Sequence, residues 1–189
     1  DNIHVAWTDQ TNSDVLYKKS ADGGETFGAT IVVGNGSYSA LSTYPLSMDV
    51  YGDFVHIVWN GSSKTVYARS TDGGATFAAE ADIANGGRPR IAATHSGLVY
   101  LIGWGGSGDD VVKFSQSTDN GANFGSISDA GVGGIVSAID ATGDNIYIMA
   151  RDGASTMKLH KSTNGGTSFA TSTIGTGSDF PNIEQSKTY

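Results

Sequence analysis

The sequence predicts an all-β fold, a four-bladed β-propeller in which four sheets of four strands follow one another along the chain. A short stretch with the pattern Ser-x-Asp/Asn-x-Gly-x-x-Phe occurs four times, with its acidic or amide residue at positions 22, 72, 119 and 164. These positions are 50, 47 and 45 residues apart, a period typical of propeller blades. No long stretch shows the apolar spacing of a helix, so helices should be nearly absent.

Each residue type in the repeated octapeptide suits a tight connection between two strands. The Asp or Asn side chain accepts hydrogen bonds from later backbone amides, and the Ser hydroxyl does so more weakly. The Gly at the fifth position of the octapeptide can take the positive φ that a hairpin connection needs. The final Phe is expected to bury its ring against the neighbouring sheet. The residues in these roles are Ser20, Asp22, Gly24, Phe27, Ser70, Asp72, Gly74, Phe77, Ser117, Asp119, Gly121, Phe124, Ser162, Asn164, Gly166 and Phe169.

The octapeptide resembles the Asp-box, or BNR repeat, of sialidase-like β-propellers. Asn164 replaces the acidic residue in the fourth copy, and Asn also caps turns. The resemblance implies that each copy joins the third and fourth strands of a blade at the outer rim. It also implies a structural role for these residues, and it carries no catalytic residue with it, so a non-catalytic member of the superfamily is expected.

The remaining strands can be placed around the four octapeptides. First, innermost strands are expected at 44–49, 88–93 and 135–140. Second strands are expected at 2–7, 54–59, 99–104 and 145–150. Third strands are expected at 15–18, 66–69, 112–115 and 157–160. Fourth strands follow each octapeptide, as at 30–33.

We expect a single propeller domain over residues 1–189. Its blades would be 1–43 together with 178–189, then 44–87, 88–133 and 134–177. The chain begins on a second strand, and a first-strand pattern recurs at 180–185. Pairing of 180–185 with 2–7 would close the ring and remove two exposed sheet edges. The alternatives are a longer propeller of six to eight blades, or a ring built from two chains.

The composition limits the expected partners and cofactors. The formal net charge is -8 with only 11 Lys and Arg, which argues against nucleic acid and anionic membranes. No apolar run is long enough to insert in a membrane. His4, His56, His95 and His160 lack the spacing of a zinc site, so no metal or other cofactor is expected, with Ca²⁺ on loop carboxylates as the alternative. A secreted or cell-surface location and a monomer are expected, with multimeric assembly as the alternative.

Three tryptophans suggest a ligand site. Each ends a second strand, whereas the fourth repeat has Ala150-Arg151 there. Strand ends at one face of a propeller are common ligand sites, and polar neighbours can hydrogen-bond a carbohydrate. The alternative is that each indole packs between adjacent blades. The candidate ligand-binding residues are Trp7, Asp9, Trp59, Asn60, Trp104, Arg151 and Asp152.

The sequence therefore predicts a non-catalytic extracellular binding module for carbohydrate, or for another surface ligand such as a protein. A structural or assembly propeller is the first alternative. A sialidase-like glycoside hydrolase is the second alternative. It is disfavoured because sialidases use three arginines to hold the substrate carboxylate, and the arginines of this chain do not match that arrangement. Arg69 directly precedes an octapeptide on an outer strand, and Arg88 and Arg90 do not reproduce the family's Arg-Ile-Pro segment. Exposed indoles would favour binding, and buried ones would favour a scaffold.

Overall fold

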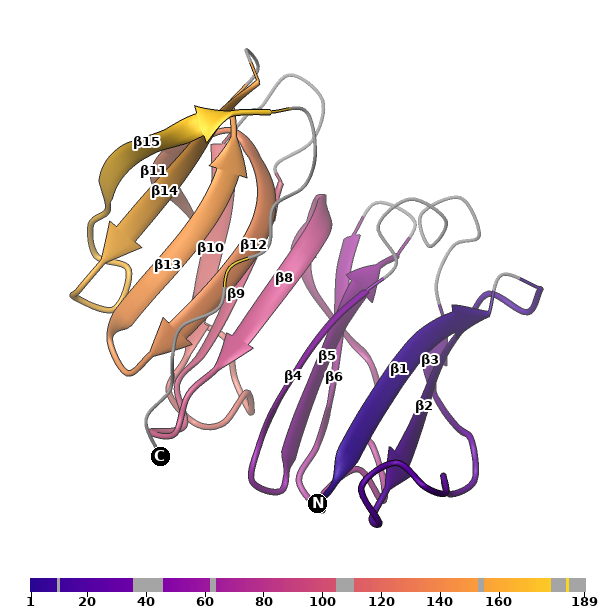
Figure 1. The fold of residues 1–189 in the computed structure, drawn as a ribbon. Helices are drawn as coiled ribbons and strands as arrows, with labels where there is room; N and C mark the ends of the chain where they lie inside the picture. Colours follow the sequence, from indigo (N-terminus) through magenta and orange to yellow (C-terminus); the bar gives the residue numbers. More distant parts are fainter. Residues whose placement is uncertain are drawn as a thin grey trace. The chain divides into compact units, whose positions relative to one another are not determined.

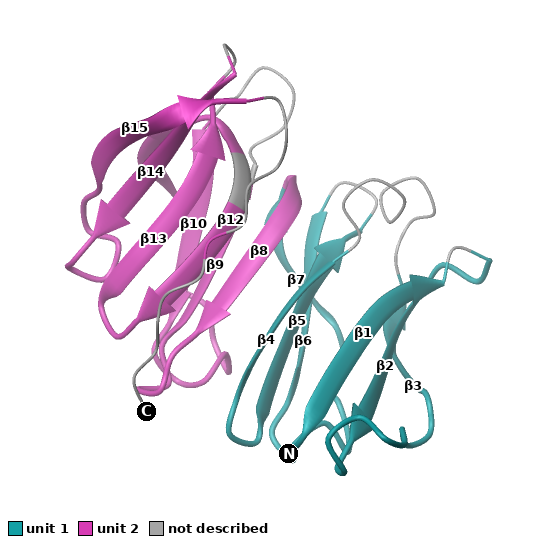
Figure 2. Cartoon of the chain, in the orientation of Figure 1, with its two compact units in different colours: residues 1–85 teal, residues 86–189 magenta. Residues whose placement is uncertain are grey.

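The computed structural model describes residues 1–9, 11–35, 46–61, 64–104, 111–152, 155–177 and 183, with only the backbone described for residues 104, 136 and 137. Within these ranges the chain consists of strands, turns and extended connections, without a helix. It divides into two compact units, unit 1 at Asp1–Asn85 and unit 2 at Gly86–Tyr189 (Figure 2).

Unit 1 contains two antiparallel sheets (Figure 1). The first has the order β1-β2-β3, formed by β1 (Ile3–Asp9), β2 (Asp14–Ser20) and β3 (Ile31–Asn35). The second has the order β4-β5-β6-β7, formed by β4 (Leu46–Tyr51), β5 (Phe54–Asn60), β6 (Lys64–Ser70) and β7 (Ala81–Asn85). Sequential strands pair side by side, as in a meander.

Unit 2 contains two antiparallel sheets of four strands each. One is formed by β8 (Gly87–Ala93), β9 (Val99–Trp104), β10 (Val111–Ser117) and β11 (Ser128–Gly133). The other is formed by β12 (Ile135–Thr142), β13 (Asn145–Arg151), β14 (Thr156–Ser162) and β15 (Ala170–Thr176). The inner strands β8 and β12 contact each other.

The all-β prediction and the predicted strand order are confirmed for the described residues. In each of the three four-stranded sheets the strands pair in the predicted first-to-fourth sequence, and every octapeptide connects a third strand to a fourth. The predicted ring-closing segment 180–185 lies outside the described residues except for Ile183, so closure stays a prediction. The first sheet accordingly has three described strands.

Alternating residues of the central strands form the core of unit 1. Successive side chains of a strand point to opposite faces, so every second residue can face the neighbouring sheet. Val15 and Tyr17 of β2 pack in one buried cluster with Val55, Ile57 and Trp59 of β5. The core thus lies between the two sheets of this unit.

The core of unit 2 follows the same rule. Tyr100 and Ile102 of β9 share a buried cluster with Ile146, Ile148 and Ala150 of β13. Each of these five side chains is fully buried. In unit 2 the second strands β9 and β13 therefore supply the main packing surface, as their near-continuous apolar sequences favour.

The hydrogen bonds from backbone amides to the Ser and Asp/Asn side chains of the octapeptide recur in all four copies, whereas the side-chain bond to the seventh residue is reversed in the fourth, where Asn164 donates to Ser168. In the second copy, the Ser70 hydroxyl donates to Asp72 Oδ1 at 2.7 Å and accepts the Gly74 amide at 2.8 Å. The Asp72 carboxylate also accepts the amide and the hydroxyl of Thr76, at 2.9 and 2.6 Å. These hydrogen bonds, to the Thr76 side chain first, hold the pKa of Asp72 well below its usual range. The carboxylate therefore stays ionised and closes the turn.

A second set of hydrogen bonds ties each octapeptide to the turn before the second strand. The Gly73 amide donates to the Asp53 carbonyl at 2.8 Å, and the Gly165 amide donates to the Asp144 carbonyl at 3.0 Å. The equivalent pairs in the other copies are Gly23 with Asp1 and Asn120 with Gly97. Each octapeptide is thus joined by a backbone hydrogen bond to the residues that precede the second strand of its own blade.

Within each unit, an octapeptide also receives an aromatic ring from the preceding sheet. A Cβ added to Gly74 would lie 2.0 Å from the Tyr17 hydroxyl oxygen, and one added to Gly166 would lie 2.4 Å from Phe114 Cζ. The rings of Phe77 and Tyr17 meet edge to face at 4.9 Å. The predicted burial of every octapeptide Phe is wrong for Phe27, which is 41% exposed.

Candidate functional site

The end of β1 carries two of the predicted ligand residues of unit 1. Trp7 is partly accessible and lies opposite Leu16 of β2. Asp9 ends the strand, and its carboxylate accepts the Thr11 amide and the Asn12 side-chain amide, each at 2.9 Å. The Thr11 amide is the main reason that the pKa of Asp9 is lowered. Trp7 and Asp9 are two residues apart on one strand, a spacing that places both side chains on the same face, so a ligand there could meet an indole and an ionised carboxylate.

Trp59 takes the second of the two positions that the sequence left open for the tryptophans. Its side chain is fully buried in the core between the two sheets of unit 1. The indole N–H donates to the Asn35 carbonyl at 2.9 Å. Asn60, the next residue, is also buried, at 8% exposure. The alternative stated from the sequence, packing between sheets, describes Trp59.

The end of β13 carries the two candidate residues of unit 2 that can be placed in full. Arg151 and Asp152 are both partly accessible. The Asp152 carboxylate accepts the Thr156 amide at 2.9 Å and forms an ion pair with Lys158 at 3.1 Å. Asp152 therefore neutralises Lys158, on the neighbouring strand β14.

Arg151 differs from its acidic neighbour in its pairing. Its Nε atom is buried and has no hydrogen-bond partner in the part of the chain that the structure describes. A buried, unpaired donor costs on the order of 1–3 kcal/mol, more when it is charged. Such a cost is unusual unless a ligand or a bound water completes the hydrogen bonding.

The third tryptophan, Trp104, pairs with the start of the strand that carries two further arginines. The backbone of Trp104 pairs with Gly87 and Val112, and its side chain lies outside the described residues. Gly87 is followed by Arg88, Pro89 and Arg90 on the inner strand β8. The sequence brings these arginines to attention only as possible sialidase residues. The pattern Arg-Pro-Arg at the start of a first strand is the signal that places them at the strand-end face.

The histidines are held in structural positions. Nδ1 of His4 and the Tyr17 hydroxyl share a hydrogen bond at 2.6 Å, and His56 and Tyr67 share one at 2.8 Å. Burial, with Arg69 as a second cause, lowers the pKa of His56 to about 4. Among the described residues no group of three or more His, Cys, Asp or Glu side chains could hold a metal ion.

The repeated antiparallel four-stranded sheet, with its inner, central and outer strands, is the blade of a β-propeller. Solved structures of this fold class are similar to the chain. The SapL1 lectin in complex with α-methyl fucoside has a TM-score of 0.65 and 15% identity over 95% of this chain and 62% of its own. A variant of Aleuria aurantia lectin with α-methyl-L-fucoside has a TM-score of 0.62 and 11% identity over 94% and 58%.

A third similar structure is a variant of NanB sialidase from Streptococcus pneumoniae, with a TM-score of 0.55 and 12% identity over 78% of this chain and 26% of its own. The chain thus spans less than two thirds of the length of each of these proteins. No protein-family model matches the sequence, and no curated protein matches it. In the described part of the chain, no helix is long and apolar enough to cross a membrane.

Proposed function

We propose that the protein is a non-catalytic extracellular module that binds carbohydrate at the strand-end faces of its blades. The observation that carries the proposal is the end of β13, where a partly accessible guanidinium has a buried Nε without a partner among the described residues. Specific sugar sites combine a few such convergent polar groups with an apolar surface. In unit 1, Trp7 and Asp9 offer an indole and an ionised carboxylate at the corresponding strand end.

Two of the similar structures support the ligand class. Both the SapL1 lectin and Aleuria aurantia lectin were solved with a methyl fucoside, and both align with nearly the whole of this chain. Propeller folds host many unrelated functions, so the fold by itself favours no particular sugar. The choice of carbohydrate rests on these similarities together with the residues at the strand ends.

The carboxylates of three octapeptides are unsuited to act as the general acid of a glycosidase. A glycosidase needs one carboxylic acid whose pKa is raised, so that it can protonate the leaving group. The pKa values of Asp22, Asp72 and Asp119 are lowered by hydrogen bonds within their own turns. These three side chains are therefore committed to closing turns.

A structural or assembly role is the second candidate, and the buried indole of Trp59 favours it. This residue stabilises the contact between two sheets and offers no surface for stacking. In this case the partner would be a protein, either a second copy of the chain or part of a larger surface structure.

Affinity electrophoresis in native gels tests the proposal. The chain is run through gels that contain neutral or acidic soluble polysaccharides, beside the variants Trp7→Ala, Arg151→Gln and Lys113→Gln. We expect at least one polysaccharide to retard the wild type and the Lys113→Gln control, and to retard a folded Trp7→Ala or Arg151→Gln variant less. Equal mobility in every gel would contradict carbohydrate binding, and stable multimers in native mass spectrometry would then favour assembly. Hydrolysis of a fluorogenic sialoside or glycoside would contradict the non-catalytic role.

A further inference from the structure

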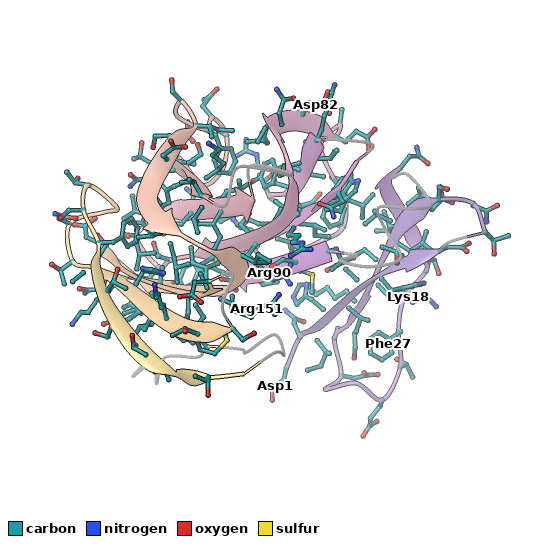
Figure 3. All side chains as sticks on the ribbon, turned by 90° about the horizontal axis from the view of Figure 1, so that it is seen from above. Asp1, Lys18, Phe27, Asp82, Arg90 and Arg151 are labelled. Carbon is teal, nitrogen blue, oxygen red and sulfur yellow. The ribbon has the colours of Figure 1, made fainter. Side chains whose placement is uncertain are left out.

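Exposed apolar side chains gather on one face of the first sheet. Tyr17 of β2 points into the core shared with the second sheet, so Leu16 and its cross-strand neighbours Trp7 and Val32 point the other way. In Figure 3, Phe27 also lies on the side of the first sheet that faces away from the second. Of the five large apolar side chains that are exposed in the described ranges, four lie on this side. The first-sheet face comprises Ile3, Val5, Trp7, Phe27 and Val32.

The corresponding face of the second sheet is covered. Ile3 pairs with Ser20 of the first octapeptide, and Val55 pairs with Ser70 of the second, so β1 and β5 have the same register to their octapeptides. The residues of β5 that match Ile3, Val5 and Trp7 are therefore Val55, Ile57 and Trp59, and all three are fully buried against the first sheet. The first-sheet face thus has the position that packs against a preceding sheet. An apolar patch of this kind marks an interaction surface.

The fourth sheet has the complementary exposed face. Ile174 is the extra residue of the bulge between β14 and β15, as Val33 is in the first sheet. Val33 is buried in the cluster that contains Trp59, whereas Ile174 is 60% exposed. A Cβ added to Gly34, next to Val33, would lie 2.7 Å from the Trp59 ring, but one added to Gly175 would meet nothing within 4 Å. The fourth-sheet face comprises Met149, Met157, Leu159, Lys161 and Ile174.

Contacts inside the chain show how these two faces fit each other. The ring of Tyr17, three residues before an octapeptide Ser, reaches Gly74 in the octapeptide of the next blade. Gly24 is the equivalent glycine of the first blade, and a Cβ added there would meet only Ile3, at 3.9 Å. Leu159 has the position of Tyr17 in the fourth blade, so the two faces together would place an apolar side chain against Gly24.

The two faces are also complementary in charge. Lys19 directly precedes the first octapeptide, and a Cβ added to Gly73 of the next blade would lie 3.1 Å from its Nζ and 3.4 Å from Asp53 Oδ1. Lys161 has the position of Lys19 in the fourth blade. Asp1 has the position of Asp53 in the first blade, because its carbonyl accepts the equivalent octapeptide amide. A lysine on the fourth-sheet face therefore corresponds to an aspartate beside the first-sheet face.

We infer that the first-sheet face packs against the fourth-sheet face of a second copy of the chain, so that two copies form one ring of eight blades. The described residues of a single chain leave Val32 and Ile174 exposed, and a second copy supplies a matching surface for each. A head-to-tail contact of this kind closes into a ring, and eight blades lie within the usual range for propellers. The inference is independent of the proposed function except at Trp7, whose indole the contact would cover.

An exchange of charges between two variants tests the inference. Asp1→Lys and Lys161→Glu each place like charges at both contacts of a two-copy ring, so each variant alone should associate several-fold more weakly than the wild type. In a mixture of the two variants, the new lysine meets the new glutamate at one contact, and the unaltered Asp1 meets the unaltered Lys161 at the other. We expect native mass spectrometry to show wild-type dimers, and mixed dimers in excess over the dimers of either variant.

Substitutions on the two faces separate association from folding. Val5→Lys and Ile174→Lys each place a charge in the apolar contact and should raise the dissociation constant of the dimer about hundredfold or more. Both side chains are exposed in one chain, so the thermal unfolding of the separated chains should change little. Lys113→Glu alters a residue that is paired with Asp129, and it should associate like the wild type.

The outcomes that overturn the inference are also distinct from those that concern carbohydrate. A monomeric wild type would overturn it, and a thermal stability lost in Asp1→Lys and regained on adding Lys161→Glu would then show that the chain's own fourth sheet covers the face. A monomer that a polysaccharide retards less after Trp7→Ala would support the sugar site and overturn the contact. A dimer that no polysaccharide retards would support the contact and count against a sugar ligand.

Discussion

Trp59 donates its indole N–H to the backbone carbonyl of Asn35 at 2.9 Å, which joins β5 to the end of β3. The amide of the same Asn35 donates to a Glu80 carboxylate oxygen at 2.9 Å, so both backbone groups of one residue are held by the neighbouring sheet. Gly34 permits this approach, because a Cβ there would lie 2.7 Å from the indole ring. The indole of Trp59 therefore acts as a buried hydrogen-bond donor between the two sheets, and its ring is not available for a ligand to stack on.

Replacing Trp59 by Phe tests the hydrogen bond between Trp59 and Asn35. Phe keeps an aromatic ring but leaves the Asn35 carbonyl without its donor, and it leaves unfilled volume in a fully buried site. We expect the free energy of unfolding in urea to fall by about 2–4 kcal/mol. Trp7→Phe is the matched control, and it should cost less because Trp7 is partly accessible. Equal losses in the two variants would contradict the structural role of Trp59.

Alanine at the octapeptide glycines tests the contact between neighbouring sheets. Gly24, Gly74 and Gly166 occupy the same position in three copies, and all three have positive φ. Alanine at Gly24 would meet only Ile3, at 3.9 Å, and should cost about 1–2 kcal/mol for the backbone alone. Gly74→Ala and Gly166→Ala should cost about 1–3 kcal/mol more, because the added methyl group overlaps the ring of Tyr17 or Phe114. Equal losses in the free energy of unfolding for all three variants would show that the rings of Tyr17 and Phe114 do not contact Gly74 and Gly166.

The buried histidine of β5 predicts an acid-sensitive fold. His56 faces Asp49 across the pairing with β4 and Arg69 across the pairing with β6, and its Nδ1 bonds the Tyr67 hydroxyl. Its pKa is lowered from 6.5 to about 4 by burial and then by Arg69. Between these values the unfolded chain binds more protons, so stability is fully present above pH 6.5 and falls toward pH 4.

The loss attributable to His56 should be on the order of 3 kcal/mol at the acid end. Urea unfolding of the wild type and of His56→Gln, measured across this range, gives the comparison. We expect the variant to lose a clear part of the pH dependence, even if its stability at neutral pH is lower. Parallel pH profiles for the two proteins would contradict a neutral, buried His56.

The fourth octapeptide predicts the result of an amide substitution in the others. Asn164 Oδ1 accepts the Ser168 amide at 3.0 Å, and its Nδ2 donates to the Ser168 hydroxyl at 2.9 Å. Asn at position 72 can make the same bonds to Thr76, so Asp72→Asn should melt near the wild type in thermal unfolding. Asp72→Ala removes every acceptor and should melt clearly lower. Similar melting of both variants below the wild type would mean that the turn requires the charge.

The sequence was sufficient for the order of the strands, because the octapeptide recurs once in each blade and marks the same connection each time. It was insufficient for the exposure of individual rings. The repeat shows that Trp7 and Trp59 occupy equivalent positions, but the residues that cover Trp59 come from the neighbouring sheet of unit 1. Phe27 and Phe77 differ for the same reason, since Phe77 meets Tyr17 from the preceding sheet.

The placement of Arg88 and Arg90 could not be predicted from the sequence, because it depends on the local backbone. Two arginines separated by Pro89 would point to the same face of a regular strand. The register shift between Gly87 and Arg90 and the positive φ of Arg88 change that direction, and neither can be read from local residue types. The ion pair between Asp152 and Lys158, and the buried Nε of Arg151 without a partner among the described residues, likewise depend on how β13 and β14 pair.

A glycan array probed with the purified chain, beside folded Trp7→Ala, Arg151→Gln and Lys113→Gln variants, tests carbohydrate binding at the strand ends most directly. We predict saturable binding to a defined group of glycans by the wild type and by Lys113→Gln, with binding reduced in Trp7→Ala or Arg151→Gln. Binding that all three variants retain would place the site elsewhere on the molecule. An array without signal above background would contradict the central claim.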